Sequence, residues 1–242
     1  MTLPLIDAHC HLSKNKELLT LLLNHHIPAM INCQTPKEWE ENQALIKNVP
    51  FLRLSFGIHP WDTDKLSFEE CLNTLDEASF IGEIGLDNLW TKVPLETQMV
   101  TFKKQLEYAS QTKKPVILHT KKREKEVLDT IQHYPNQYLV HWYGTLDYLD
   151  DYIALGCYFT IGPSLKNEPY LVELMTRVPF ERLLMESDGL EALKWVHASP
   201  SVDYITEQEN MLHIMGNVFH QSPEDIGYQL QANFNQWLQG SR

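Results

Sequence analysis

The chain has 242 residues, of which 43% are hydrophobic and 21% are charged, and this composition excludes the disordered and fibrous classes. Its formal net charge is -12, which argues against a strongly electrostatic grip on nucleic acid because that grip needs clustered lysines and arginines. A nuclease that reaches phosphate through metal ions is not excluded. The sequence shows neither a run of about 18 apolar residues nor a secretion signal, so we expect a cytoplasmic protein without a membrane span.

Eight short apolar or β-branched runs are predicted as strands. They cover residues 5–10, 29–33, 52–59, 80–86, 115–120, 138–143, 157–162 and 183–187. Helical patterns follow the strands, the longest at about 95–112, 122–133, 145–155, 203–219 and 223–238. Strict alternation of strand and helix predicts a parallel sheet, and eight such units in one chain of this length predict a (β/α)8 TIM barrel. We therefore expect an α/β fold with a single domain over residues 1–242.

Several helices have legible starts. Thr35 precedes a proline and is followed three residues later by Glu38, and Ser67 is followed in the same way by Glu70. Ser222 precedes another proline at the start of the last helix. These are N-cap and capping-box patterns, in which a side-chain oxygen accepts a hydrogen bond from a free backbone N–H of the first turn.

The four cysteines show no paired C-x-x-C spacing, so the sequence indicates neither a disulfide framework nor a structural zinc site. We expect free and buried thiols, as is usual for single cysteines in a core. They are Cys10, Cys33, Cys71 and Cys157.

Titratable residues gather where the predicted strands end, which is where a barrel enzyme carries its site. They are His9 and His11 in the first strand, His59 in the third, Glu83 and Asp87 in the fourth, His119 in the fifth, His141 in the sixth, and Glu186 and Asp188 in the eighth. The other histidines fall in helices or loops and are expected to be solvated or packed. Any one of these motifs is a modest signal, but their joint placement favours a metal site.

Strand geometry explains the first motif, "DAHCH". Alternate residues of a strand point to the same face, so Asp7, His9 and His11 share one side. Two imidazoles and a carboxylate from another strand form an N,N,O set that suits a divalent transition metal, most often zinc. Asp7, deeper on that face, is expected to orient a ligand rather than to bind metal. Glu83 lies inside an apolar run and needs a counter-ion, which a metal would supply.

The chain resembles the TatD family of metal-dependent hydrolases, within the amidohydrolase-like barrels. The motifs that carry the resemblance are "DAHCHL" at 7–12, "GIHPW" at 57–61, "IGEIGLD" at 81–87, "PVILHT" at 115–120, "HWYG" at 141–144, "MESDG" at 185–189 and "ANFNQWL" at 232–238. The spacing of Gln98, Phe102 and Gln105 is also similar to that of the family.

The resemblance implies a two-metal centre that hydrolyses phosphodiester bonds, notably as a deoxyribonuclease at the 3′ ends of DNA. One divalent ion (Mg²⁺, Mn²⁺ or Zn²⁺) would be held by His9, His11 and Asp188, and the other by His119 and His141, with Glu83 bridging. His59 and Trp61 are similar to parts of the family's substrate pocket. The expected partner is single-stranded or end-exposed DNA, with no obligatory protein partner. Asp188 is expected to be both ligand and general base, with Glu83 as the second catalytic carboxylate.

Three segments depart from the family pattern. Lys121 stands where an arginine is usual, so the cation expected to face phosphate lacks the bidentate fork of a guanidinium. "WYGT" follows His141, and "GLEALKWVHASP" follows Asp188, in place of the usual loops. None of the three departures changes an expected metal ligand. They concern loops that shape the substrate pocket.

Two other functions stay open at this stage. One is a barrel hydrolase of a small amide, lactone or phosphoester, which the acidic balance favours. The other is a metal-loaded or metal-free binding protein without turnover. Trp61 could stack on bases or roof the barrel, whereas Trp142 and Tyr143 are expected to pack. The basic run from Lys121 to Lys125 is interrupted by Glu124, so it is expected to be the solvated start of a helix.

Overall fold

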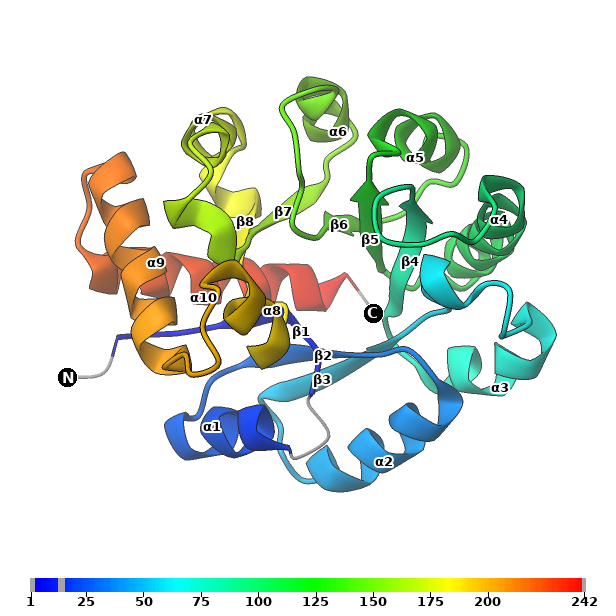
Figure 1. Ribbon diagram of the computed structural model, residues 1–242, viewed down its shortest axis with the longest axis horizontal. Helices are drawn as coiled ribbons and strands as arrows, with labels where there is room; N and C mark the ends of the chain where they lie inside the picture. Colours follow the sequence, from blue (N-terminus) through cyan, green and yellow to red (C-terminus); the bar gives the residue numbers. More distant parts are fainter. Residues whose placement is uncertain (1–2, 13–15, 241–242) are drawn as a thin grey trace. The chain divides into compact units, whose positions relative to one another are not determined.

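The computed structural model describes residues 3–12 and 16–240. Its eight strands are hydrogen-bonded in chain order, β1-β2-β3-β4-β5-β6-β7-β8, and each is followed by at least one helix (Figure 1). The predicted (β/α)8 fold class is therefore confirmed. The strands are β1 Asp7–Cys10, β2 Ala29–Cys33, β3 Leu52–Phe56, β4 Ile81–Asp87, β5 Val116–Lys121, β6 Tyr138–Val140, β7 Tyr158–Ile161 and β8 Leu183–Met185.

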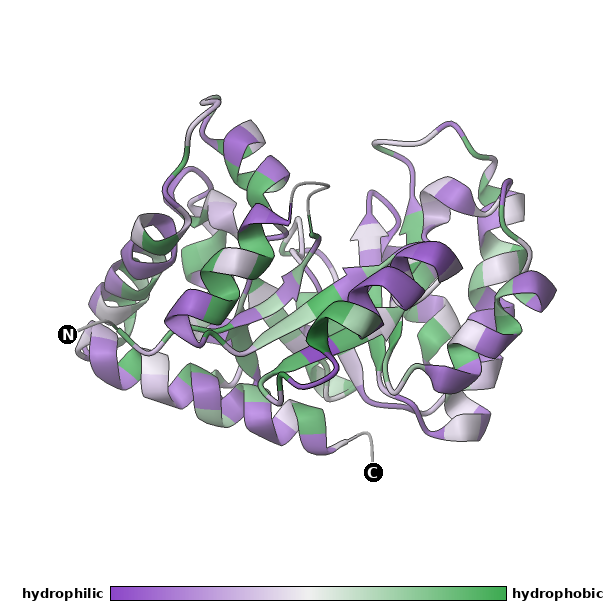
Figure 2. Ribbon diagram, turned by 90° about the horizontal axis from the view of Figure 1, so that it is seen from below, coloured by the Kyte–Doolittle hydropathy of each residue, from purple (hydrophilic) through white to green (hydrophobic). Residues whose placement is uncertain are grey.

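The helices vary from six to 18 residues. They are α1 Glu17–His25, α2 Pro36–Ile46, α3 Phe68–Glu77, α4 Leu95–Thr112, α5 Glu124–Ile131, α6 Leu149–Ala154, α7 Tyr170–Arg177, α8 Leu190–Val196, α9 Tyr204–Phe219 and α10 Pro223–Gln239, with short 3-10 helices η1 Pro60–Asp62, η2 Pro163–Lys166 and η3 Phe180–Arg182. Hydrophilic and hydrophobic residues alternate along α10, as expected of a helix with one buried face (Figure 2). Among the described residues, no helix is long and apolar enough to cross a membrane.

The predicted helix starts are confirmed. The Thr35 hydroxyl accepts a hydrogen bond from the Glu38 backbone N–H at 3.1 Å. Ser67 and Glu70 form a complete capping box. At the start of α10 the Ser222 hydroxyl accepts from the backbone N–H of Asp225, also at 3.1 Å. Each cap satisfies a first-turn N–H that would otherwise lack an intrahelical partner.

Contacts within the chain gather into two compact units. The first comprises the N-terminal residues through Ile31, Val49–Arg53 and Phe159–Leu238; the second comprises Asn32–Asn48, Leu54–Tyr158 and the residues from Gln239 onward. The prediction of a single domain over residues 1–242, a range that includes residues outside those described, stays a prediction.

In the first unit, α10 is fastened to the strand side by polar groups as well as by its apolar face. The Asn233 amide donates to the carbonyl oxygens of Phe180 at 2.6 Å and Leu183 at 2.9 Å. Asn233 and Phe234 are both almost fully buried, so both side chains pack inside the first unit.

In the second unit, two glutamines of α4 satisfy backbone groups next to the candidate site. Gln98 accepts from the Asp87 N–H at 2.8 Å and donates to the Asp87 carbonyl at 2.9 Å. Gln105 makes the same pair of bonds with Ile58, at 2.7 and 3.1 Å. These buried amides replace strand partners where the strands end, so α4 fixes the backbone on which the site side chains stand.

Strands β4 and β5 also approach unusually closely in this unit. Gly85 pairs with His119, and a Cβ at this position would lie 1.9 Å from the His119 carbonyl oxygen. Only glycine fits there, because any side chain would push His119 away from its place on β5.

Candidate metal centre

The first unit contains a cluster of His9, His11 and Asp188, here called the HxH cluster. The Asp188 oxygen Oδ1 lies 3.4 Å from His9 Nε2 and 3.6 Å from His11 Nε2. The two imidazole rings are 5.1 Å apart and nearly perpendicular. His9 is fully buried, whereas the side chains of His11 and Asp188 are 27% and 21% exposed. The HxH cluster therefore combines a buried imidazole, that of His9, with an accessible carboxylate, that of Asp188.

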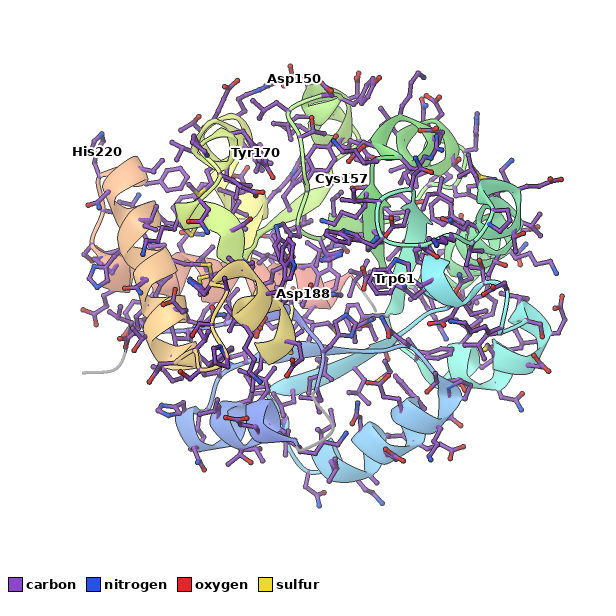
Figure 3. The ribbon with its side chains drawn as sticks, viewed as in Figure 1. Trp61, Asp150, Cys157, Tyr170, Asp188 and His220 are labelled. Carbon is purple, nitrogen blue, oxygen red and sulfur yellow. The ribbon has the colours of Figure 1, made fainter. Side chains whose placement is uncertain are left out.

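The backbone beyond β8 holds Asp188 against β1. Asp188 (Figure 3) has a φ of 55°, in the left-handed region, and its N–H donates to the His9 carbonyl at 3.1 Å. Gly189 follows with a φ of 95°, and a Cβ there would lie 2.6 Å from the His11 carbonyl oxygen. A turn of this shape and closeness requires glycine at 189, which explains the "SDG" sequence.

Asp7 supports this turn from below. Its carboxylate accepts hydrogen bonds from the Ser187 N–H at 2.9 Å, the Ser187 hydroxyl at 2.6 Å and the Tyr204 hydroxyl at 2.9 Å. Burial raises the pKa of Asp7 to about 7, although the hydrogen bonds from Ser187 and Tyr204 act in the opposite direction. Asp7 was expected to orient a ligand. Ser187, the residue before Asp188, and Tyr204 both donate hydrogen bonds to its carboxylate.

The second unit contains the other predicted ligands, Glu83, His119 and His141, here called the Glu83 cluster. His59 lies beside them. Glu83 Oε1 lies 2.5 Å from His119 Nδ1, 2.7 Å from His141 Nε2 and 3.5 Å from His59 Nε2. The facing nitrogens of His119 and His141 are 3.3 Å apart. All four side chains are at least 95% buried. A glutamate in an apolar strand thus has three imidazoles around one oxygen, which answers the need for a partner noted from its sequence.

His119 lies between two carboxylates. Its Nδ1 faces Glu83, and its Nε2 is 2.9 Å from Asp87 Oδ2. Burial alone lowers the pKa of His119, but the charge of Glu83 and the hydrogen bonds with both carboxylates outweigh it and leave the pKa raised.

His59 lies three residues beyond the end of β3, not within the strand as predicted. The strand ends at Phe56 because the chain turns into η1, and His59 caps that helix: its Nδ1 accepts from the Trp61 N–H at 3.2 Å. An imidazole whose Nδ1 is an acceptor carries its proton on Nε2 when neutral, so His59 presents an N–H toward Glu83. His141 likewise follows β6, which ends at Val140.

The side chains of Trp61 and Lys121, which are both predicted to contact substrate, are each held by a hydrogen bond. Trp61 is 41% exposed (Figure 3), and its indole N–H donates to Asp87 Oδ2 at 2.7 Å. The Lys121 ammonium donates to the Trp142 carbonyl and lies 5.2 Å from the centre of the Trp142 ring. Tyr143 is buried and donates to the Asp147 carbonyl at 2.5 Å, which confirms its packing role.

The remaining histidines were predicted to be solvated or packed, and the basic run from Lys121 to Lys125 to be the solvated start of a helix. Arg123 pairs with Glu126 and Lys125 with Asp129, both at 2.6 Å within α5 and its cap, as expected of a solvated helix start. His197 lies 3.1 Å from a carboxylate oxygen of α9, and the other histidines outside the clusters are exposed. All four cysteines are buried thiols outside any disulfide, as predicted.

The donor atoms of both clusters suit a divalent ion. Ligand atoms about 2.0–2.1 Å from a tetrahedral metal lie ~3.3 Å from one another. The separations among His9, His11 and Asp188, and among Glu83, His119 and His141, bracket that value. Imidazole nitrogen and carboxylate oxygen are donors for Zn²⁺ and Mn²⁺ alike. The residues present therefore fit the metal ions that the sequence predicts.

Asp87 is a member of the site whose role sequence reasoning missed. Besides His119 and Trp61, it accepts from the backbone N–H groups of Leu89 and Trp90. Burial alone raises the pKa of Asp87, but these hydrogen bonds together hold it well below its usual range. The available signal was its parity with Glu83 in "GEIGLD", which places both carboxylates on one face of β4.

The chain is similar to several known proteins. The family model described as TatD related DNase matches residues 6–239. An uncharacterized metal-dependent hydrolase of Bacillus subtilis, YabD, is 24% identical over 60% of this chain and 61% of its own length. The 3′-5′ ssDNA/RNA exonuclease TatD of Citrobacter rodentium is 26% identical over 78% of this chain and 76% of its own.

Among solved structures, the TatD homolog YJJV of Escherichia coli superposes with a TM-score of 0.82 at 20% identity, covering 96% of this chain and 97% of the other. That likeness concerns the fold, which is again the predicted one. The family model spans nearly the whole chain and includes every residue of both clusters. The chain therefore belongs to the TatD related DNase family, and its predicted class, a metal-dependent hydrolase, follows from that membership.

Proposed function

We propose that this chain is a divalent-metal-dependent phosphodiesterase that removes nucleotides from the 3′ ends of single-stranded DNA. The observation that carries the proposal is the pair of N,N,O donor sets, the HxH cluster and the Glu83 cluster, each compact enough for one ion. The name of the Citrobacter relative, a 3′-5′ ssDNA/RNA exonuclease, supports the substrate class and the direction.

We assign one ion to His9, His11 and Asp188, and a second to Glu83, His119 and His141. Mg²⁺, Mn²⁺ and Zn²⁺ are the candidates, since mixed nitrogen and oxygen donors accept all three. Such ions, when bound, polarise a scissile phosphate and lower the pKa of water. The bridging role that the resemblance implies for Glu83 stays a prediction.

Asp188 is the proposed general base. Its carboxylate is partly exposed, so it can accept a proton from an attacking water, and the turn through Gly189 keeps it beside the two imidazoles of the HxH cluster. Glu83 is buried among imidazoles and is the proposed carboxylate of the second set. His59 presents an N–H in the same direction as the ligands and suits a phosphate oxygen.

Substrate contacts are proposed for Trp61 and Lys121 as well. The exposed indole of Trp61 offers a face on which a base can stack, an interaction worth roughly 1–3 kcal/mol in single-strand binders. Lys121 supplies a positive charge two residues beyond His119, and reaching a phosphate requires it to leave the Trp142 carbonyl. Because lysine lacks the planar fork of arginine, its contact with phosphate is less directional.

The test is a nuclease assay on single-stranded DNA. Purified chain with Mg²⁺, Mn²⁺ or Zn²⁺ should shorten a 5′-labelled strand stepwise and should release a 3′-terminal label at once, with EDTA abolishing both. His11→Ala should lose this activity. The matched control is His133→Ala, an exposed histidine on no cluster. Release of the 5′ label at once, with the 3′ label retained, would overturn the direction. Failure to shorten either DNA or RNA would overturn the proposed nuclease activity.

One observation favours a second candidate function. The net charge of -12 disfavours long contacts with a polyanion and suits a small amide, lactone or phosphoester substrate. Hydrolysis of such compounds by the metal-loaded chain, with no shortening of nucleic acid and with loss in His11→Ala, would establish this alternative in place of the nuclease.

A further inference from the structure

The carboxylate of Asp87, at the end of β4, contacts a proposed substrate residue and a proposed metal ligand through the same oxygen. Oδ2 accepts from the Trp61 indole N–H at 2.7 Å and lies 2.9 Å from His119 Nε2. Oδ1 accepts from the backbone N–H groups of Leu89 at 2.6 Å and Trp90 at 2.8 Å. Four donors therefore surround a side chain that is fully buried.

The backbone bonds fix how this carboxylate is oriented. Leu89 and Trp90 hold Oδ1 from the loop that follows β4, and Gln98 holds the Asp87 main chain from α4. Removing the indole N–H of Trp61 would leave all of these bonds in place. Oδ2 would then still point at His119, and only the number of donors that share it would change.

The contact with Asp87 also selects which nitrogen of His119 is available to a metal. A carboxylate at Nε2 holds the proton there, which leaves the lone pair on Nδ1. Nδ1 is the atom that faces Glu83 and His141. Carboxylates that hold a ligating histidine in this way raise its basicity and its affinity for metal.

Two donors that share one oxygen compete for its charge. While Trp61 donates to Oδ2, the bond from His119 to the same oxygen is weaker than it would be alone. We propose that Asp87 is a positioning residue that couples the state of Trp61 to the metal affinity of His119, so that releasing the indole tightens metal binding. This rests on the proposed function in that His119 must be a metal ligand.

Linkage makes the coupling reciprocal. A base that stacks on Trp61 and draws its indole away from Asp87 strengthens the hold on the metal, and bound metal makes that movement easier. Occupation of the substrate side would therefore stabilise the loaded Glu83 cluster without any direct contact between substrate and His119.

The experiment measures Zn²⁺ affinity by competition with a chromophoric chelator, with no substrate present. Asp87→Asn should weaken binding about 10–100-fold, the usual cost of losing such a partner. Trp61→Phe should tighten binding, roughly two- to tenfold, because one neutral hydrogen bond to Oδ2 is removed. In the Asp87→Asn background the tightening should vanish. Opposite signs are the signature, since a merely structural role would weaken binding in both single variants.

Controls separate the possible failures. Trp90→Phe changes an exposed tryptophan but keeps the backbone N–H that donates to Asp87, so its Zn²⁺ affinity should match the parent. Melting of the metal-free variants confirms that each is folded. Unchanged or weaker binding in Trp61→Phe, with weaker binding in His119→Ala, would overturn the coupling alone. Unchanged binding in His119→Ala would overturn the ligand assignment of the proposed function.

Discussion

Asp7 binds Ser187 twice, through the Ser187 backbone N–H at 2.9 Å and through its hydroxyl at 2.6 Å. The same hydroxyl accepts from the Gly189 N–H at 2.9 Å. Ser187 thus joins the buried foot of β1 to the turn that carries Asp188. One small side chain determines where that carboxylate stands.

Replacing this hydroxyl should loosen the turn. Ser187→Ala removes a donor to Asp7 and an acceptor for Gly189 in a buried place, so the free energy of unfolding should fall by about 1–3 kcal/mol. Urea unfolding in the presence of a chelator measures the change. Ser199→Ala, whose exposed hydroxyl bonds only the Ser201 carbonyl, should stay within about 0.5 kcal/mol of the parent. Equal stability of the two variants would refute the role of Ser187.

Asp188→Asn should separate folding from turnover. The amide keeps the size of the side chain and part of its ability to bind metal, but it cannot take a proton from water. We expect an unchanged fold by circular dichroism and a drop in the rate of DNA shortening of about 10²–10⁴-fold. Asp64→Asn, an exposed carboxylate of the same kind, serves as the control. Near-normal turnover in Asp188→Asn would remove the base assignment.

Gly189 should tolerate no side chain. A φ of 95° is strained for any other residue, and the added Cβ would collide with the His11 carbonyl. Gly189→Ala should therefore cost on the order of 1–3 kcal/mol of stability and should weaken metal binding by the HxH cluster. Gly144→Ala is the matched control, because nothing lies within 4 Å of its added Cβ. Thermal melting and metal titration of both variants test this, and a stable, metal-binding Gly189→Ala would contradict it.

The Cys71 thiol should be unreactive in the folded chain. Burial, with a smaller contribution from the charge of Glu70, raises the pKa of Cys71 to about 11, and only the thiolate is a good nucleophile. In the unfolded chain the pKa is about 8.5. Between these values the folded state keeps a proton that the unfolded state releases, so this group lowers stability as pH rises through that window.

Alkylation followed by mass spectrometry checks this. At pH 8 iodoacetamide should label Cys71 slowly in buffer and fast in guanidinium, with the rate in buffer climbing as the pH approaches 11. The loss of stability above pH 9 should be smaller in Cys71→Ala. Fast labelling of the folded chain at pH 8 would show that the thiol is accessible and that burial does not set its pKa.

Long, regular elements were predictable from the sequence. The range 95–112 was predicted for α4 and 29–33 for β2, and both agree with the structure. In each, one clear pattern covers the whole element: the buried stripe of Gln98, Phe102 and Gln105 in the helix, and a run in the strand that is buried throughout and apolar except for Asn32. Local preference and burial point the same way there, so tertiary contacts add little new information.

Short helices and strand ends were not predictable in the same way. Helix α7 (Tyr170–Arg177) and helix α8 (Leu190–Val196) have eight and seven residues, and the sequence predicted a helix after each of the last two strands without giving its bounds. The third strand was predicted to run to 59 but ends at Phe56, and beyond it the N–H and the carbonyl of Ile58 pair with the Gln105 side chain of α4. Polar residues just beyond the end of a strand still fit the residue pattern of that strand, although the hydrogen bonding between strands has already ended.

The sequence predicted which residues form the candidate site, but not which hydrogen bonds hold those residues in place. Every residue of the two clusters carries a ligand-type side chain on a strand or just beyond its end, which the sequence displays directly. The partners that hold them are different in kind. Asp87 beside His119, and Ser187 beside Asp7, are hydrogen bonds between residues 32 and 180 positions apart, and their geometry depends on how distant strands meet.

The two glutamines of α4 limit how this helix can change in length. Gln98 and Gln105 are seven residues apart, close to two helical turns, so both amides emerge from one side and meet the backbone of Asp87 and Ile58. A single residue inserted between them would turn one amide by about 100° around the helix axis. Two buried backbone groups would then lose their hydrogen-bond partners. Natural or engineered insertions in this family member should therefore fall outside that interval.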